Sequence, residues 1–107
     1  MKIIFHVVDI NKWDDVLSNV RGLISQIPDC KIEIIVMSKA AALFNSYTGA
    51  DFTGIIGNPN VNITIGEKAL EDNRLKREML PHEIKVEPLV ITKIVELQNE
   101  GYGYIRL

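Results

Sequence analysis

KIIFHVV at residues 2–8 and KIEIIVM at residues 31–37 are the two apolar runs that decide the fold. Both are rich in β-branched residues, a pattern typical of strands that are buried on both faces of a parallel sheet. Between them, apolar residues recur with helical spacing from Trp13 to Ile27, and Asn11 is the expected N-cap of this helix. Residues 2–37 therefore predict a βαβ unit with a right-handed crossover.

The rest of the chain continues the alternation of strands and helices. Pro88 is placed at the first position of the last helix, and Gly101 ends that helix. The pattern predicts a single domain, residues 1–107, built as a three-layer α/β/α sandwich around a mostly parallel sheet of about five strands, flavodoxin-like in outline. The remaining predicted elements are a short helix at 39–44, a loop with one helical turn at 45–60, strands at 61–65, 84–87 and 102–107, and an irregular helix at 67–77.

Composition and charge exclude several classes of protein. The chain has 107 residues, a net charge of −2 and a single cysteine, Cys30. This charge provides no overall positive field for nucleic acid, and one cysteine cannot form an internal disulfide. The apolar run at residues 2–8 is too short for a signal peptide or a membrane span. We therefore expect a cytoplasmic protein that binds neither nucleic acid nor membrane.

The candidate functional site lies at the carboxyl edge of the predicted sheet, where ligands gather in open parallel sheets. Neither a phosphate-binding loop nor a GxGxxG pattern is present. Gly66, where a strand meets a helix, has two interpretations: a weaker anion site, or a tight turn, which is the favoured one. The predicted ligand-binding residues are Asn11, Lys39, Gly66, Glu67 and Lys68.

The other reactive side chains point to structural roles. We predict that His6 in the first strand is a buried, hydrogen-bonded histidine and that His82 is an exposed turn residue. Neither has the spacing of a metal site, so we expect no metal and no cofactor. Cys30 precedes the second strand, on the edge opposite the candidate site. Tyr102 and Tyr104 share one face of the last strand and are the predicted subunit contacts.

Six segments follow one another in a characteristic order: IIFHV at residues 3–7, LSNV at 17–20 after Trp13, LP at 80–81, IKVEP at 84–88, VELQ at 95–98 and EGYGYI at 100–105. Their order resembles the DsrE/DsrF-like family of sulfur-relay proteins. The resemblance covers nearly the whole chain and is weakest at residues 45–60. It implies an α/β sandwich that assembles as a homo-oligomer, a trimer or a hexamer, with related sulfur-relay proteins as candidate partners.

The chain departs from the family at the position that matters most for sulfur chemistry. The resemblance implies a persulfide-carrying cysteine just after the third strand, and this position falls on Gly66. Because glycine has no nucleophile, we predict a protein without a catalytic residue, which acts as a binding or assembly partner and carries no persulfide. The alternative is a small-molecule or anion-binding protein, or an enzyme, that uses a pocket at residues 66–68.

Overall fold

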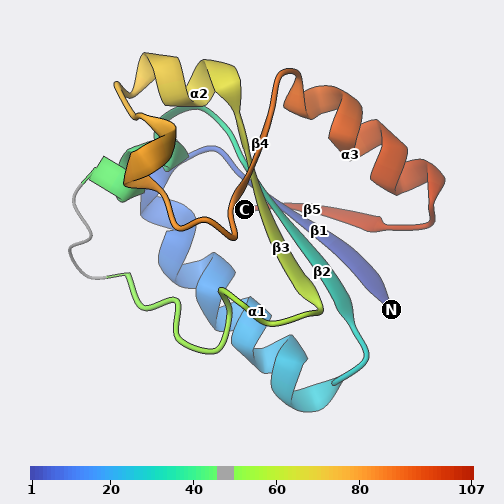
Figure 1. The fold of residues 1–107 in the computed structure, drawn as a ribbon. Coiled ribbons are helices and arrows are strands. Elements are labelled where there is room, and N and C mark those ends of the chain that lie inside the picture. Colours follow the sequence, from blue (N-terminus) through green and yellow to red (C-terminus); the bar gives the residue numbers. More distant parts are fainter. Residues whose placement is uncertain (46–49) are drawn as a thin grey trace.

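Five parallel strands form one sheet in the centre of the protein. The computed structural model describes residues 1–45 and 50–107, and its strands lie in the order β4-β3-β2-β1-β5 (Figure 1). All four pairings are parallel, so the mostly parallel sheet of the prediction is parallel throughout. The strands are β1 (Lys2–Val7), β2 (Lys31–Val36), β3 (Val61–Gly66), β4 (Lys85–Glu87) and β5 (Gly103–Arg106).

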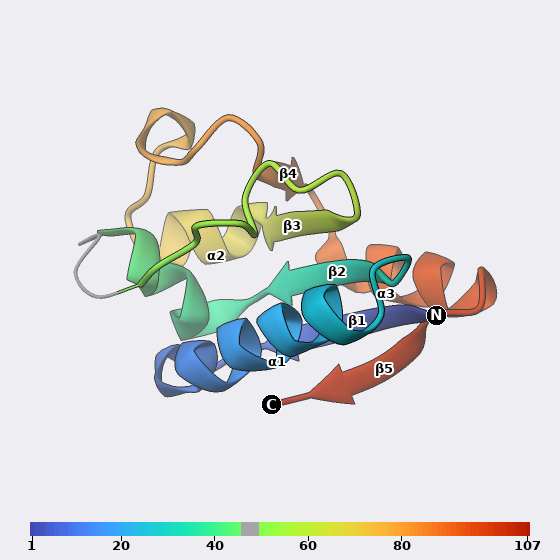
Figure 2. The same cartoon turned by 90° about the horizontal axis from the view of Figure 1, so that it is seen from below.

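Helices cover both faces of the sheet, which confirms the predicted α/β/α sandwich. Helix α1 lies against one face and α3 against the other, as Figures 1 and 2 show. The connection from β4 through α3 carries the chain back across the sheet to β5, beside β1. The helices are α1 (Trp13–Gln26), α2 (Glu67–Asp72) and α3 (Val90–Asn99), with 3-10 helices η1 (Ile10–Lys12), η2 (Ser38–Asn45) and η3 (Arg77–Met79).

Helix starts differ from the prediction in two places. Asp9, not Asn11, is the capping residue: its carboxylate accepts a hydrogen bond from the Asn11 amide at 2.8 Å and begins η1. Helix α1 then starts at Trp13 without a side-chain cap. Pro88 lies two residues before α3, whose N-cap is Leu89, so its predicted place at the first helical position is wrong.

Two further segments are less regular than their composition suggested. The predicted helix at 67–77 ends at Asp72, and Arg74 follows it with a φ of 55°, which stops the helix. In the predicted loop at 45–60, residues 46–49 lie outside the described part of the chain. Residues 53–57 form turns, with Gly54 and Gly57 at positive φ.

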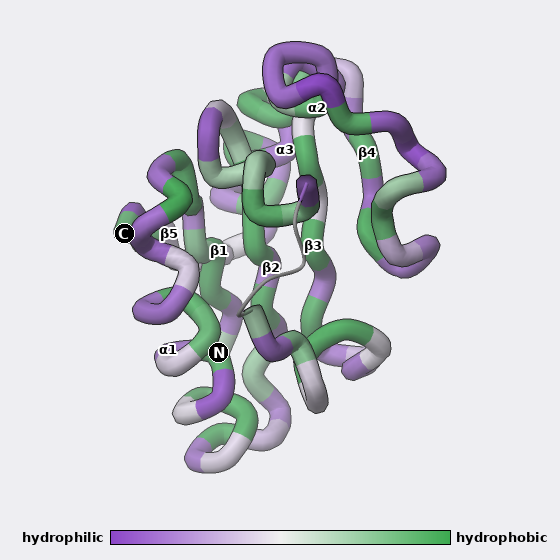
Figure 3. The backbone as a smooth tube through the Cα atoms, turned by 90° about the vertical axis from the view of Figure 1, so that its left-hand side faces the viewer, coloured by the Kyte–Doolittle hydropathy of each residue, from purple (hydrophilic) through white to green (hydrophobic). Residues whose placement is uncertain are grey.

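The two faces of the sheet differ in chemistry. The main core, on the α1 side, takes Phe5, Ile34 and Ile63 from the three central strands. The α3 side buries a smaller cluster that includes Ile4 and Ile35. The same side also holds the three buried polar residues of the described chain, which are His6, Glu33 and Thr64. Figure 3 shows the central strands as mainly hydrophobic segments enclosed by mixed helices and loops.

Trp13 fixes the start of α1 to the sheet, as its place on the buried stripe predicted. Its side chain is 2% exposed, and its indole Nε1 donates to the Ala40 carbonyl at 2.8 Å. The ring makes edge contacts with Phe44 and Phe52, whose centroids lie 5.9 and 5.6 Å away. This aromatic group joins α1, η2 and the loop before β3.

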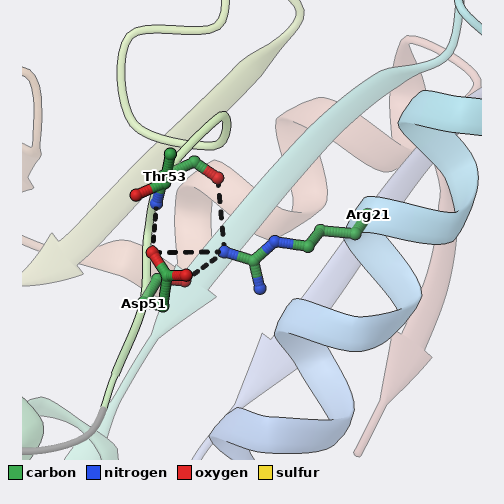
Figure 4. A network of polar contacts seen from close by, with 3 residues as sticks. All are labelled: Arg21, Asp51 and Thr53. Atoms are coloured by element: carbon green, nitrogen blue, oxygen red, sulfur yellow. Dashed lines mark hydrogen bonds and ion pairs between the residues drawn. The ribbon is translucent and has the colours of Figure 1, made fainter.

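Arg21 holds that same loop from the exposed side of α1 (Figure 4). Its Nη2 atom donates to the carbonyl oxygens of Asp51 and Thr53 and lies 3.8 Å from the Asp51 carboxylate. The Thr53 amide donates to that carboxylate at 2.9 Å. A hydrogen bond with the Thr53 side chain, and after it the one with the Thr53 amide, are the main reasons that the pKa of Asp51 lies below its ordinary value.

Candidate functional site

Two hollows formed by the described residues lie at the carboxyl edge of the sheet, and four of the five predicted ligand-binding residues are divided between them. The first, here called the Gly66 hollow, has a volume of about 210 Å³ and includes Gly66 and Lys68. The second, called the edge groove, has a volume of about 600 Å³ and includes Asn11 and Lys39. Glu67 lines neither of them, and Ser38 lines both. The single site expected from the sequence is therefore two neighbouring sites.

Gly66 is required by a close contact and not by its backbone conformation. Its φ of −73° and ψ of 143° are ordinary extended values that any residue adopts. A Cβ atom at this position would lie 3.2 Å from Cγ1 and 3.4 Å from Cβ of Val90. Val90 belongs to the first turn of α3 and is 6% exposed. The missing side chain thus lets α3 approach β3, and Val90 occupies the adjoining space.

The walls of the Gly66 hollow are mainly apolar. Met37, Ala69 and the segment from Pro88 to Ile91 line it. Lys68 supplies the positive charge at its rim, but the Lys68 ammonium lies 3.2 Å from the Asp72 carboxylate, which already offsets this charge. Such a hollow suits an apolar group better than an anion.

The edge groove contains two positive residues that were not predicted from the sequence. Lys12 and Arg106 line it together with the predicted Asn11 and Lys39 and with Asp9. Lys12 is next to Asn11 in the chain and could have been predicted as a ligand-binding residue with it. Arg106 could not have been predicted, because its position depends on the pairing of β5 with β1, which the sequence does not specify.

His6 is a buried, hydrogen-bonded histidine, as predicted. Its Nδ1 lies 2.5 Å from the Tyr104 hydroxyl and its Nε2 lies 2.9 Å from the Met37 sulfur. With neutral imidazole, the Tyr104 hydroxyl donates to Nδ1 and Nε2–H faces the sulfur. Burial lowers the pKa of His6, and the nearby charge of Arg106 lowers it further. His6 thus ties β1 to β5 and to the end of β2.

Glu33 and Thr64 are buried on the same face of the sheet, under α3. Glu33 is 4% exposed, and this burial raises the pKa of its carboxyl. A side-chain hydrogen bond with Asn62 and the charges of Lys93 and Lys85 act in the opposite direction. Thr64 is 1% exposed, and its hydroxyl oxygen has no hydrogen-bond partner. Neither burial could be predicted from the sequence, since both residues lie in strands that are mainly apolar.

The remaining candidates lie away from the two hollows. Cys30 is 2% exposed and precedes β2 at the amino edge of the sheet. The side chain of His82 is 92% exposed in a turn, with Nδ1 3.4 Å from Glu83, so it is the solvent-facing residue that was expected. Tyr102 is half-buried and Tyr104 is 41% exposed, on the same face of the last segment.

Among residues 1–45 and 50–107, no three histidine, cysteine or acidic side chains come together as metal ligands could. No helix in this part of the chain combines the length and the hydropathy that crossing a bilayer demands.

Comparison with known proteins adds information about the fold. No family model matches the chain, and no curated protein matches it either. A solved structure of the protein of unknown function MTH1491 from Methanobacterium thermoautotrophicum has a TM-score of 0.83 and 24% sequence identity, covering 99% of this chain and 98% of that one. This likeness shows that the two chains share the same α/β fold over their whole lengths. The resemblance to the DsrE/DsrF-like family stays a prediction.

Proposed function

We propose that this chain is a DsrE/DsrF-like protein that binds or assembles with partners and carries no persulfide of its own. The observation that carries the proposal is the contact between Val90 and Gly66. The resemblance would place a sulfur-carrying cysteine at residue 66. Here that position has no side chain, and α3 packs against the backbone where one would project.

Cys30 is a poor substitute for the missing cysteine. A sulfur-accepting thiol must be accessible, and its thiolate form must be favoured by its surroundings. The Cys30 thiol is 2% exposed, belongs to the main core, and lies at the opposite edge of the sheet from Gly66. Its Sγ–H donates a long hydrogen bond, 3.9 Å, to the Lys31 carbonyl. These features favour a structural role for Cys30.

The partner surface of this proposal begins at the Gly66 hollow. Leu89 and Ile91 line the hollow and are 60% and 55% exposed, and Val95 follows one turn later on α3 with 49% exposure. An apolar hollow with exposed apolar residues at its rim suits an apolar side chain from another protein. The partner is either a second copy of this chain, in a trimer or hexamer, or a related sulfur-relay protein. Tyr102 and Tyr104 are the proposed additional contacts.

Sulfur transfer to the folded protein provides the test. The protein is incubated with a sulfurtransferase and its persulfide donor, and persulfides are trapped by alkylation and located by mass spectrometry. We expect no persulfide on Cys30 in the folded protein, whereas in denaturant the same thiol reacts with the trapping reagent. The double variant Gly66→Cys/Val90→Ala restores a thiol with space around it and is the positive control. A stable persulfide on Cys30 of the folded protein would overturn the proposal.

Assembly is tested separately by sedimentation at micromolar concentration. We expect a homo-oligomer, and the exposed apolar residues Ile91 and Val95 are replaced by serine to weaken it. Thr92→Ser is the matched control, because Thr92 is exposed on the same helix and serine keeps the hydroxyl that donates to the Leu89 carbonyl. If the protein sediments as a strict monomer, it does not assemble with itself, and the proposed partner can only be a different protein.

A further inference from the structure

The order of the strands marks one position at the carboxyl edge of the sheet. β2, β3 and β4 are added one after another on one side of β1, whereas β5 lies on its other side (Figure 2). Where the order reverses in this way, the connections leave in opposite directions and a crevice remains beyond the strand ends. Ligands of open parallel sheets bind at this reversal. The edge groove lies there, since residues that follow β1 and β2 and the end of β5 line it.

Unpaired positive charge is concentrated in this groove. Lys12, Lys39 and Arg106 all line it, and within residues 1–45 and 50–107 none of their charged groups has a hydrogen-bond or ion-pair partner. The acidic side chain in its lining is that of Asp9, which accepts the hydrogen bond from the Asn11 amide. Three cationic side chains and one acidic side chain give the lining an excess of positive side-chain charge, in a protein whose net charge is −2.

The backbone is strained where it enters the groove. Ser38 has a φ of 52°, in the left-handed region that residues other than glycine rarely adopt. It directly follows Met37 after β2, and the turn brings Lys39 to the groove. Strained residues of this kind persist at functional sites because the surrounding structure holds them.

We propose that the edge groove binds a phosphate-bearing organic molecule of about mononucleotide size, with Lys12, Lys39 and Arg106 around the phosphate. Its volume, about 600 Å³, lies within the usual range for small-molecule sites, roughly 300–1,000 Å³. Val8 and Ile10 give it apolar surface for the body of such a molecule. Arg106 can bind two phosphate oxygens at once, and the lysines add point charges. The proposal concerns a different hollow from the partner surface on α3, so either can fail alone.

Titration of the isotope-labelled protein with adenosine monophosphate, followed by NMR, provides the test. We expect saturable shifts of the amide signals of Asn11, Lys39 and Arg106. Inorganic phosphate is expected to shift the same signals with weaker affinity, and adenosine, which lacks the phosphate, to leave them unchanged. Affinity for both anions falls as salt is raised, because the charges are exposed.

Charge-removing variants identify the residues responsible. Lys39→Gln and Arg106→Gln are each expected to weaken binding of adenosine monophosphate about tenfold, the effect of losing one charge-assisted hydrogen bond. Lys68→Gln, at the rim of the other hollow, is the matched control and leaves the affinity unchanged. The proposal is overturned if neither anion gives saturable shifts, if adenosine binds as well as its monophosphate, or if Lys68→Gln weakens binding as much as Lys39→Gln.

Discussion

Val90 places its Cγ1 atom 3.2 Å from the point where a Cβ atom of residue 66 would lie, so Gly66 and Val90 form a matched pair between β3 and α3. This distance is shorter than ordinary carbon contacts, so the Val90 side chain or α3 must shift by a few tenths of an ångström to admit a methyl group at residue 66. We expect Gly66→Ala to lower the free energy of unfolding by about 1 kcal/mol, at the low end of the cost of overpacking. Urea unfolding measures this change.

A double-mutant cycle shows whether the contact with Val90 causes the loss of stability in Gly66→Ala. In a Val90→Ala background the space beside residue 66 is open, so Gly66→Ala should cost less there than in the parent protein. Gly22→Ala is the control, since nothing lies within 4 Å of a Cβ at that helical position. Equal costs of Gly66→Ala in both backgrounds would show that the contact with Val90 is not responsible.

The fold was predictable because local pattern and global architecture agree in β1, α1 and β2. Their apolar runs and the helical stripe from Trp13 onward specify buried parallel strands and a crossover helix. The cap of η1 and the start of α3 were predicted wrongly, since capping depends on hydrogen bonds and turn geometry that differ by one or two residues between similar sequences. Asp9 and Asn11 are both good capping residues, and sequence alone does not choose between them.

The candidate site was predicted only in part, for a topological reason. Parallel strands place Asn11, Lys39 and Gly66 at one edge of the sheet. They do not determine whether the three residues line the same hollow. Their separation depends on the strand order, which places β5 beside β1 and brings Arg106 to the groove. Gly66 was likewise read as a turn residue because the approach of Val90, a contact between residues distant in sequence, leaves no local signal.

Glu33 is expected to destabilise the protein at neutral pH. Burial raises the pKa of its carboxyl in the folded state. The folded protein is therefore stabilised while this carboxyl is protonated, below its unfolded pKa of about 4.3. That stability is lost as the pH rises through the pKa of the folded state. Glu33→Gln keeps the shape and the capacity to bond Asn62 while removing the charge. It should therefore raise the free energy of unfolding at pH 7 by about 1 kcal/mol.

The free energy of unfolding of the parent and of Glu33→Gln, measured from pH 7 down to pH 4, tests this prediction. The difference in favour of Glu33→Gln should shrink as the pH falls toward 4, where the parent carboxyl is protonated. Glu96→Gln, at an exposed position on α3, is the control. A destabilised Glu33→Gln at pH 7 would mean that the charges of Lys93 and Lys85 outweigh the burial.

His6 is expected to make the protein less stable in mild acid. Burial, and to a smaller extent the charge of Arg106, lowers the pKa of His6 from 6.5. The unfolded chain therefore takes up a proton first, and the stability that is fully present above pH 6.5 is lost as the pH falls below it. NMR titration of the imidazole signals measures the pKa directly, with the exposed His82 as the comparison in the same spectrum.

A single substitution separates the two causes at His6. Arg106→Gln removes the like charge but leaves the imidazole buried, so the pKa of His6 should rise part of the way toward its ordinary value. Lys68→Gln, which is not among the causes of the shift, should leave it unchanged. No rise in Arg106→Gln would assign the whole effect to burial.

Arg21 is expected to control the loop before β3 more than the stability of the whole domain. Its guanidinium donates to the carbonyls of Asp51 and Thr53 from an exposed position, where ion pairs contribute little to global stability. Arg21→Ala should thus change the free energy of unfolding by less than about 1 kcal/mol. The Ile55 amide, bonded to the Phe52 carbonyl at 2.9 Å, should exchange with solvent faster.

Two comparisons test what Arg21 contributes to the loop. In Arg21→Lys the charge is kept, but the ammonium lies on a shorter side chain than the Nη2 atom that donates to both carbonyls, so exchange at Ile55 should increase in this variant too. Thr53→Val removes the hydroxyl that contributes most to the low pKa of Asp51, and this pKa should rise more than in Arg21→Ala. If Arg21→Lys exchanged as slowly as the parent while Arg21→Ala did not, charge alone would hold the loop, and the two carbonyl contacts would be incidental.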